Sequence, residues 1–372
     1  MGNALPRLAF VTERTSVKAR HILPYLSKNF GITLITYSDD TEIPEGQYRS
    51  IIRVPIPKHE MMPTTAWRMS RLVDRLYVEG AIDFAYVYSS VAYLIRKCPY
   101  VNIVNGCYRE DFKVCMSYAP WMNRLRAPLG ILHYVLPEMI ACKRAVKLIP
   151  VSAALGTMVQ EYYGRQTGDI YPVQNGMSEE YLQLYDARKF DERPLNILYT
   201  GRLHFRKGIV RFCREFVRRK DIESHFWIAG DGPDRASLEA LARNDKRVHV
   251  VGHLDRKALA ELLKTTHIYA FPSLHEGFGL SLAEAMASGH ACIVYDMPVN
   301  REVLGNAGLF CRYGDHVGLV NLLAACVADL QLIRQKAEEA HLKAKEYSWD
   351  RCASEMEAAL SRVYRDVTEA SV

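Results

Sequence analysis

The sequence predicts an α/β protein of two domains, each built on a parallel sheet. Short apolar segments alternate with helical stretches, a pattern that favours parallel strands joined by crossover helices. A second alternating series begins near Leu195. The chain has 372 residues, which is enough for two domains that each bury a core.

The first series predicts its elements in chain order. We expect a helix over 17–26 and strands over the ranges 8–11, 31–37, 84–88 and 101–104. A polar stretch over 180–193 then marks a hinge between the domains. We therefore place an N-terminal domain at 1–185, a C-terminal domain at 186–348 and a last helix within 349–372.

The most informative segment is a loop between two apolar strands, 267–271 and 291–295. Strong helix formers over 280–287 predict a helix, and Gly289 is a suitable stop. Two carboxylates flank the start of that helix: Glu276 lies in the loop after the strand, and Glu284 lies one to two turns into the helix. Between them, Gly277 and Gly279 allow close backbone approach, while the N–H groups of the first helical turn favour an anion. Such a site suits phosphate joined to a hydroxyl-rich sugar.

A second loop of the same kind follows the predicted strand 196–201. It contains Arg202 and Lys207, a forked guanidinium and a compact ammonium suited to a diphosphate. A third strand and turn follows at 226–233. Each piece has an ordinary structural alternative, since basic loops are often merely solvated and paired glutamates are common on exposed helices.

Together these motifs resemble the retaining nucleotide-sugar glycosyltransferases of the GT-B class, which include bacterial transferases of cell-surface polysaccharides. The resemblance is specific over 196–310 and implies two Rossmann-like doubly wound domains facing across a cleft, with the last helix crossing back to the first domain. It also implies a role for each site residue. Arg202 and Lys207 would hold the donor diphosphate, Glu284 the ribose hydroxyls, and Glu276 the transferred sugar. The backbone of Phe278, Gly279 and Leu280 would support sugar and phosphate.

The resemblance implies hexose transfer, with retention of configuration, from a UDP- or GDP-sugar to a hydroxyl acceptor, either a sugar or a lipid-linked sugar. We expect no metal and no other cofactor, because the cations and N–H groups neutralise the diphosphate. Base choice is expected to depend on contacts near 250–254. Two other functions stay open: a sugar-nucleotide epimerase, and a non-catalytic nucleotide-sugar-binding or scaffold protein.

The family often has a glycine-rich loop after the first strand, but here the loop 12–16 contains no glycine. Arg14 or Lys18 could replace its contact with the donor phosphates.

Composition favours a cytoplasmic protein. Nine scattered cysteines without a Cys-x-x-Cys pair argue against a disulfide framework and a zinc site. No apolar run reaches the length of a membrane span, and the N-terminus lacks a signal-peptide core.

The charge is uneven along the chain. Residues 51–150 contain 14 Lys or Arg against 7 Asp or Glu. Within them, the segments 61–77 and 121–136 mix cations with aromatic and aliphatic residues. Such segments predict either peripheral contact with the anionic inner face of the cell membrane or core helices with a solvated basic face. We expect no nucleic acid, because the surplus is modest and no nucleic-acid module is recognisable.

Overall fold

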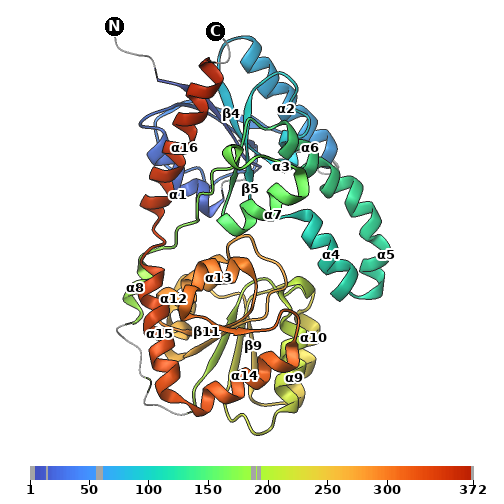
Figure 1. The fold of residues 1–372 in the computed structure, drawn as a ribbon, viewed down its shortest axis with the longest axis vertical. Coiled ribbons are helices and arrows are strands. Elements are labelled where there is room, and N and C mark those ends of the chain that lie inside the picture. Colours follow the sequence, from blue (N-terminus) through green and yellow to red (C-terminus); the bar gives the residue numbers. More distant parts are fainter. Residues whose placement is uncertain (1–4, 14–15, 56–61, 186–189, 191–193, 370–372) are drawn as a thin grey trace. The chain divides into compact units, whose positions relative to one another are not determined.

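The computed structural model describes residues 5–13, 16–55, 62–185, 190 and 194–369. It confirms the predicted α/β class, with two six-stranded sheets whose strands are all parallel (Figure 1). Much of the predicted hinge, 186–189 and 191–193, lies outside the described residues.

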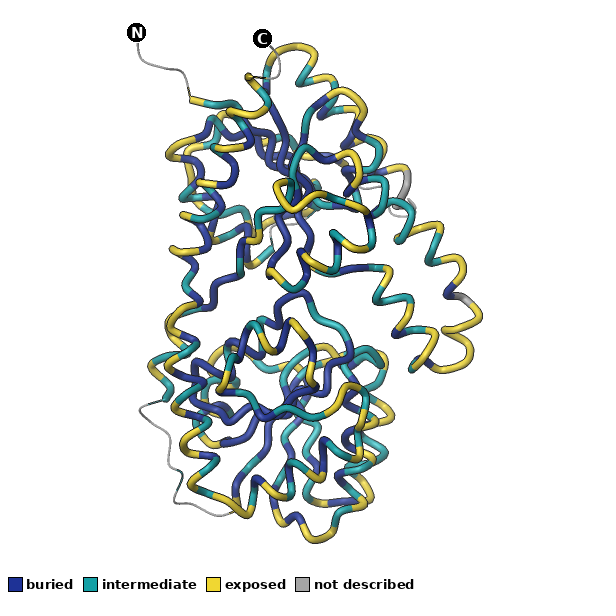
Figure 2. The backbone as a smooth tube through the Cα atoms, in the orientation of Figure 1, coloured by how far each residue is buried: buried dark blue, intermediate teal, exposed yellow. Residues whose placement is uncertain are grey.

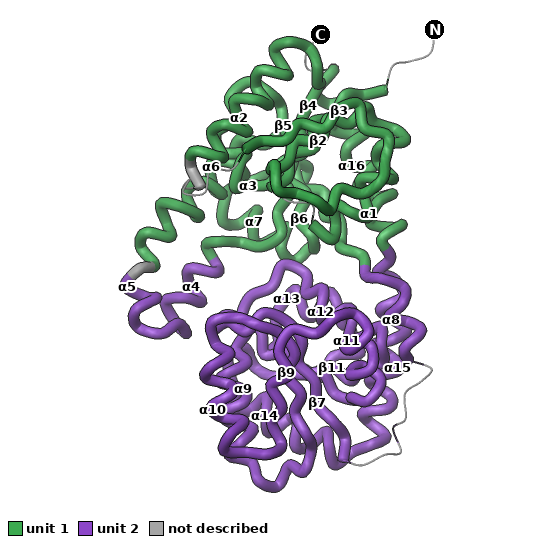
Figure 3. The backbone as a smooth tube through the Cα atoms, turned by 180° about the vertical axis from the view of Figure 1, so that it is seen from behind, with its two compact units in different colours: residues 1–109, 126–176, 349–372 green, residues 110–125, 177–348 purple. Residues whose placement is uncertain are grey.

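Two compact units divide the chain (Figure 3). Unit 1 comprises Met1–Arg109, Arg126–Gly176 and Trp349–Val372, and unit 2 comprises Glu110–Leu125 and Met177–Ser348. The structure thus changes unit at 176/177, whereas the sequence analysis places the boundary at 185/186. It also assigns a stretch of the N-terminal half, Glu110–Leu125, to unit 2.

Unit 1 is organised around a sheet with the strand order β3-β2-β1-β4-β5-β6. Its strands are β1 (Arg7–Val11), β2 (Gly31–Tyr37), β3 (Tyr48–Val54), β4 (Phe84–Tyr88), β5 (Tyr100–Val104) and β6 (Lys147–Pro150). Its helices are α1 (Val17–Leu26), α2 (Met62–Val78), α3 (Ser89–Ala92), α6 (Leu136–Arg144), α7 (Ala153–Tyr163) and α16 (Trp349–Glu369). The last helix, α16, packs against α1, with Met356, Leu360 and Val363 fully buried.

Two further helices span the junctions between the units along the chain, α4 (Tyr108–Tyr118) and α5 (Trp121–Gly130). A π-helical turn, Ile131–Val135, follows α5 and leads into α6.

Unit 2 has the strand order β12-β11-β10-β7-β8-β9. The strands are β7 (Ile197–Thr200), β8 (Phe226–Ala229), β9 (Val248–Gly252), β10 (Ile268–Phe271), β11 (Ala291–Tyr295) and β12 (Leu309–Cys311). The helices are α8 (Glu180–Gln183), α9 (Ile209–Arg218), α10 (Arg235–Asn244), α11 (Arg256–Thr265), α12 (Leu280–Ala287), α13 (Pro298–Leu304), α14 (His316–Ala328) and α15 (Leu330–Ala344).

The core of each unit is its central strands. Every residue of β5, β10 and β11 is buried, which is the pattern of strands covered by helices on both faces (Figure 2). In unit 2 the chain proceeds from β7 to β8 and β9 on one side, then crosses to β10, β11 and β12 on the other. Ligands of open α/β sheets bind at such a reversal, outside the carboxyl ends of the strands. By this rule, a ligand of unit 2 is expected at the carboxyl ends of β7 and β10.

Candidate donor site in unit 2

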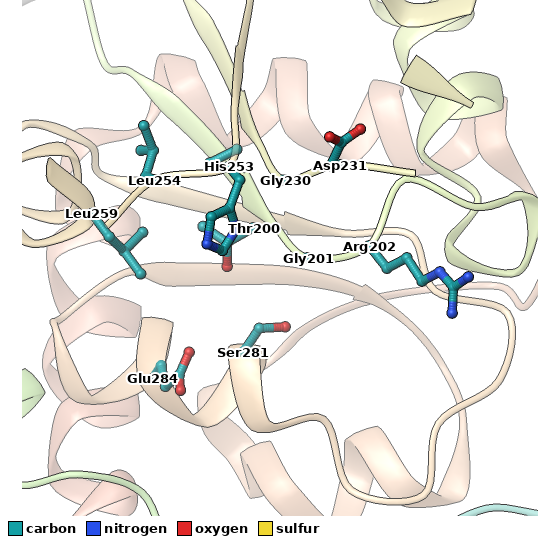
Figure 4. A pocket seen from close by; sticks show the side chains of 11 residues that line it. Thr200, Gly201, Arg202, Gly230, Asp231, His253, Leu254, Leu259, Ser281 and Glu284 are labelled. Carbon is teal, nitrogen blue, oxygen red and sulfur yellow. The ribbon is translucent and has the colours of Figure 1, made fainter. Parts of the chain in front are cut away.

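A cavity of about 410 Å³ lies at the reversal point of the second sheet (Figure 4). Its lining comes from the carboxyl ends of β7, β8 and β9 and from α11 and α12. The lining residues are Thr200, Gly201, Arg202, Ala229, Gly230, Asp231, His253, Leu254, Leu259, Ser281 and Glu284. Of the predicted site residues, Arg202 and Glu284 therefore share one cavity.

Helix α12 contributes one polar face to this cavity. Ser281 and Glu284 are three residues apart and half-buried on the cavity side, whereas Leu282, Ala283 and Ala285 are buried in the core. Burial raises the pKa of the Glu284 carboxyl to about 7, and the negative charge of Glu180 adds to the shift. The site thus holds a poorly solvated carboxyl group that lines the cavity.

The start of α12 has the backbone that the glycine pattern predicts. Gly279 is the N-cap residue and has a left-handed φ of 90°. A side chain would be strained there. The helix has eight residues, and its amino end follows the Glu276 loop. Phe278 turns its side chain into the core, where its ring meets Tyr347 edge-on at 5.4 Å, and it does not line the cavity.

The loops after β7 and β10 are fastened to each other. Leu274 N–H donates to the Arg206 carbonyl at 2.8 Å. At Gly208, where φ is 64°, a Cβ atom would lie 2.1 Å from the Pro272 carbonyl oxygen. This close approach of two backbones explains why glycine begins α9.

Lys207 and Glu276 form an ion pair across these two loops. The Lys207 ammonium lies 2.5 Å from Glu276 Oε1, and the Ser273 hydroxyl donates to the same oxygen at 2.6 Å. Neither residue lines the cavity itself; they occupy the adjoining loops. The structure therefore groups the predicted residues as two pairs, Arg202 with Glu284 at the cavity and Lys207 with Glu276 beside it.

Arg202 differs from the other two cations of the first loop, Lys207 and Arg206, which both form ion pairs. Arg206 is committed to an ion pair with Asp111 of α4, within unit 2. Arg202, in contrast, is exposed and makes no ion pair with any residue that the structure describes. Its guanidinium is thus available to an anionic ligand.

A single buried hydroxyl connects the elements around the cavity. The Tyr269 hydroxyl on β10 donates to the Thr200 carbonyl at 2.9 Å and lies 3.0 Å from Thr200 Oγ1. This hydroxyl fixes the end of β7 relative to β10.

The predicted base-contact region 250–254 supplies His253 and Leu254 to the cavity. Leu259 of α11 and the Gly230–Asp231 turn also line the cavity. Neither is predicted from the sequence to contact a ligand. Gly230, with φ of 141°, packs so closely on the Gly201 carbonyl that a Cβ would lie 1.9 Å from its oxygen. The sequence Gly-Asp-Gly-Pro at 230–233 is the feature from which this close packing could have been predicted.

Arg14 and Lys18 are the two residues expected to replace the contact of a glycine-rich loop with the donor phosphates, and both belong to the part of the chain assigned to unit 1. Lys18 is buried, and its ammonium donates to the Val173 carbonyl at 3.3 Å. Burial lowers the pKa of this amine. Arg14 lies outside the described residues.

The fold and the site define a class. Two doubly wound parallel sheets, one with a cavity at its reversal point, form the architecture of the GT-B glycosyltransferases, as predicted. Sucrose-phosphate synthase from Thermosynechococcus elongatus has this fold, with a TM-score of 0.74 over 98% of this chain and 100% of that one. At 17% identity, the likeness shows the fold alone.

The sequence comparisons cover a smaller part of the chain than the structural comparison, and they match named sequences rather than a fold alone. Residues 194–329 match the family model "Glycosyl transferases group 1". This match confirms the predicted resemblance to glycosyltransferases in that part of the chain.

Two curated relatives match over similar stretches. One is the glycogen synthase of Mycobacterium tuberculosis, 27% identical over 58% of this chain and 53% of that protein. The other is the N,N'-diacetylbacillosaminyl-diphospho-undecaprenol alpha-1,3-N-acetylgalactosaminyltransferase of Campylobacter jejuni, 30% identical over 51% of this chain and 50% of that protein. The chain spans about half the length of these relatives.

Proposed function

We propose that the protein transfers a sugar from a nucleoside diphosphate sugar to a hydroxyl group. The observation that carries this proposal is the cavity at the end of the second sheet, with a guanidinium that has no ion pair among the described residues and a desolvated carboxyl on α12. An anionic diphosphate and a diol-bearing ribose have the complementary groups.

In this proposal Arg202 and the amino end of α12 hold the diphosphate, with Lys207 in the adjoining loop. Glu284 accepts hydrogen bonds from the ribose hydroxyls. His253, Leu254 and Leu259 form the wall against which a base would pack. The donor is a UDP- or GDP-sugar.

The chemistry is a substitution at C1 of the sugar. The bond between C1 and the phosphate oxygen breaks, and the nucleoside diphosphate leaves with the electron pair. A bond forms between C1 and the acceptor oxygen, whose proton passes to a phosphate oxygen of the leaving group. Positive charge from Arg202, Lys207 and the helix N–H groups stabilises the leaving diphosphate. These groups perform the neutralisation that a metal performs in other transferases.

In this proposal Glu276 acts on the transferred sugar. The contacts from Lys207 and Ser273 orient its carboxylate in the loop before α12. Two roles fit this position: an anchor for sugar hydroxyls, or a nucleophile in a double displacement that retains configuration.

The acceptor in this proposal is a sugar or a lipid-linked sugar, in polysaccharide or glycolipid synthesis on the cytoplasmic face of a membrane. The Campylobacter relative, whose name specifies an undecaprenol-linked substrate, supports the lipid-linked form. Within the described residues no single helix is long and apolar enough to cross a bilayer; only α14 and α15 pass that test together, as a pair bent by 106°.

The proposal is tested with sugar-labelled UDP- and GDP-sugars and a panel of sugar and lipid-linked acceptors. We expect label in the acceptor and an equivalent release of nucleoside diphosphate. Arg202→Ala is expected to lower kcat/KM about 100- to 1000-fold without loss of folding, because it removes one stabilising cation of the leaving group. Arg218→Ala, which removes an exposed arginine on α9, is the matched control and should transfer normally.

The two other functions give different results in the same assay. An epimerase would convert donor to an isomeric nucleotide sugar without any acceptor. A binding protein would bind donor without turnover. A folded Arg202→Ala protein with normal turnover would refute the diphosphate assignment.

A further inference from the structure

Unit 1 has a basic hollow on its surface that the proposed transfer reaction does not use. The hollow measures about 840 Å³ and lies between the outer face of α2 and the segment 94–97. Its lining residues are Trp67, Arg68, Arg71, Leu72, Asp74, Arg75, Val78, Glu79, Leu94, Arg96 and Lys97. Five of them are cations and two are carboxylates, so the hollow has a surplus of three positive charges.

Both carboxylates are already engaged. Asp74 accepts the backbone N–H groups of Arg96, Lys97 and Cys98 at 2.8 to 3.2 Å. These bonds attach the segment 94–98 to α2 and set two further cations beside the basic face of that helix. Glu79 faces Arg75, with 4.0 Å between their charged atoms. Because both carboxylates already have partners within the hollow, the charge that the hollow presents to solvent is positive.

Helix α2 is held by its opposite face. Met69, Ser70 and Val73 are buried, which leaves the face with Trp67, Arg71 and Arg75 exposed to solvent. Trp67 is 51% exposed, and the Arg71 guanidinium lies 5.1 Å from its ring centre. An exposed indole among arginines is the residue pattern that occurs at the level of lipid headgroups.

Exposed apolar side chains and positive charge coincide in this part of the sequence. Ten of the fifteen exposed large hydrophobic side chains within the described residues belong to 51–150, the same stretch that has the surplus of cations. Two of these side chains, Trp67 and Val78, line the hollow itself. A basic surface for soluble anions has no need of exposed tryptophan and valine, whereas a bilayer surface accepts both features.

We propose that the basic hollow of unit 1, formed by α2 and 94–97, docks on a bilayer containing anionic phospholipid. The lipid phosphates pair with Arg71, Arg75, Arg96 and Lys97, and Trp67 enters the headgroup layer. This proposal does not depend on the transferase activity. It selects the first of the two alternatives for the segment 61–77, and it specifies the surface that a lipid-linked acceptor would share.

The test is co-sedimentation of the full chain with vesicles of phosphatidylcholine alone and of phosphatidylcholine with phosphatidylglycerol. We expect binding only to the anionic vesicles, weakened by salt. Arg71→Gln with Arg96→Gln should lower the affinity at least about tenfold, since each cation near such a surface contributes about fivefold. The control removes two exposed cations of unit 2, Arg243→Gln with Lys246→Gln, and should bind normally.

A second measurement follows the fluorescence of the Trp67 indole. Trp67→Phe should reduce the quenching of tryptophan fluorescence by brominated phosphatidylglycerol, while its thermal shift with nucleotide sugar stays normal and shows that unit 2 is intact. Equal binding to neutral and anionic vesicles, or normal binding of the Arg71/Arg96 double variant, would overturn the proposal. Complete competition by millimolar inorganic phosphate at constant ionic strength would identify a site for soluble phosphate instead.

Discussion

At the scale of single residues, Glu284 is the most informative group of the candidate site. Its carboxyl is half-buried at the cavity, and burial raises its pKa to about 7, with Glu180 as the lesser cause. A donor that brings hydroxyl groups to this carboxyl favours the ionised form, because a carboxylate accepts two hydrogen bonds and a protonated carboxyl accepts fewer. Donor affinity is therefore coupled to the ionisation of Glu284.

The expected consequence is a pH dependence of donor binding. As pH falls below about 7, Glu284 takes up a proton in the free protein, so affinity should decrease by up to about tenfold per pH unit. A nucleotide sugar is a suitable probe because both of its phosphates are esterified and stay ionised in this range. Calorimetric titration between about pH 5.5 and 8.5 measures the effect. Glu284→Gln should bind weakly at every pH; a pH profile that this substitution leaves unchanged would exclude Glu284 as the cause.

At the scale of secondary-structure elements, the site depends on how separate loops are joined. The Tyr269 hydroxyl links β10 to the end of β7, and the Lys207–Glu276 pair links the loops after β7 and β10. These contacts cross long distances in sequence, so the local conformation of each loop alone does not produce the cavity.

Tyr269→Phe tests the link between β10 and the end of β7. Loss of the buried hydroxyl should lower the free energy of unfolding by about 0.5–1.5 kcal/mol and also weaken donor binding, since its partner Thr200 lines the cavity. The matched control is Tyr347→Phe, whose hydroxyl donates to the Val303 carbonyl at 2.9 Å. It should cost similar stability and leave donor binding unchanged. Chemical denaturation and calorimetric titration separate the two effects. Equal losses of affinity in both variants would contradict the role given to Tyr269.

Local pattern predicts the elements well. The ranges of α1, β2, β4, α12 and β11 agree with the sequence analysis residue for residue, because each combines an apolar run with a clear start or stop. The rest depends on non-local contacts. The strand order that brings His253 and Leu254 to Glu284, and the packing of Glu110–Leu125 with unit 2, come from crossovers that no local spacing specifies.

At the scale of the whole molecule, each unit has its own core, and the chain returns to unit 1 for its last helix. Leu360 of α16 is fully buried in unit 1, whereas Leu323 of α14 is fully buried in unit 2. The candidate donor cavity draws all of its lining from unit 2. Stability of unit 1 and donor binding should thus be separable.

Leu360→Ala is expected to destabilise unit 1 by about 2–5 kcal/mol through the cavity it creates, while nucleotide-sugar affinity at low temperature stays normal. Leu323→Ala should instead lower the melting temperature of the transition that nucleotide sugar stabilises. Scanning calorimetry with and without donor distinguishes these outcomes. If Leu360→Ala abolished donor binding in a protein that is still folded, the cavity in unit 2 would be insufficient for binding.

The central claim is that the cavity at the reversal point of the second sheet binds a nucleoside diphosphate sugar. Its most direct test is the thermal stabilisation of the purified chain by UDP-, GDP- and ADP-sugars and by the free diphosphates, without added metal. The account predicts a rise in melting temperature with one base class, lost in Glu284→Ala and in Arg202→Ala. No shift with any nucleotide, or a shift that both variants retain, would contradict it.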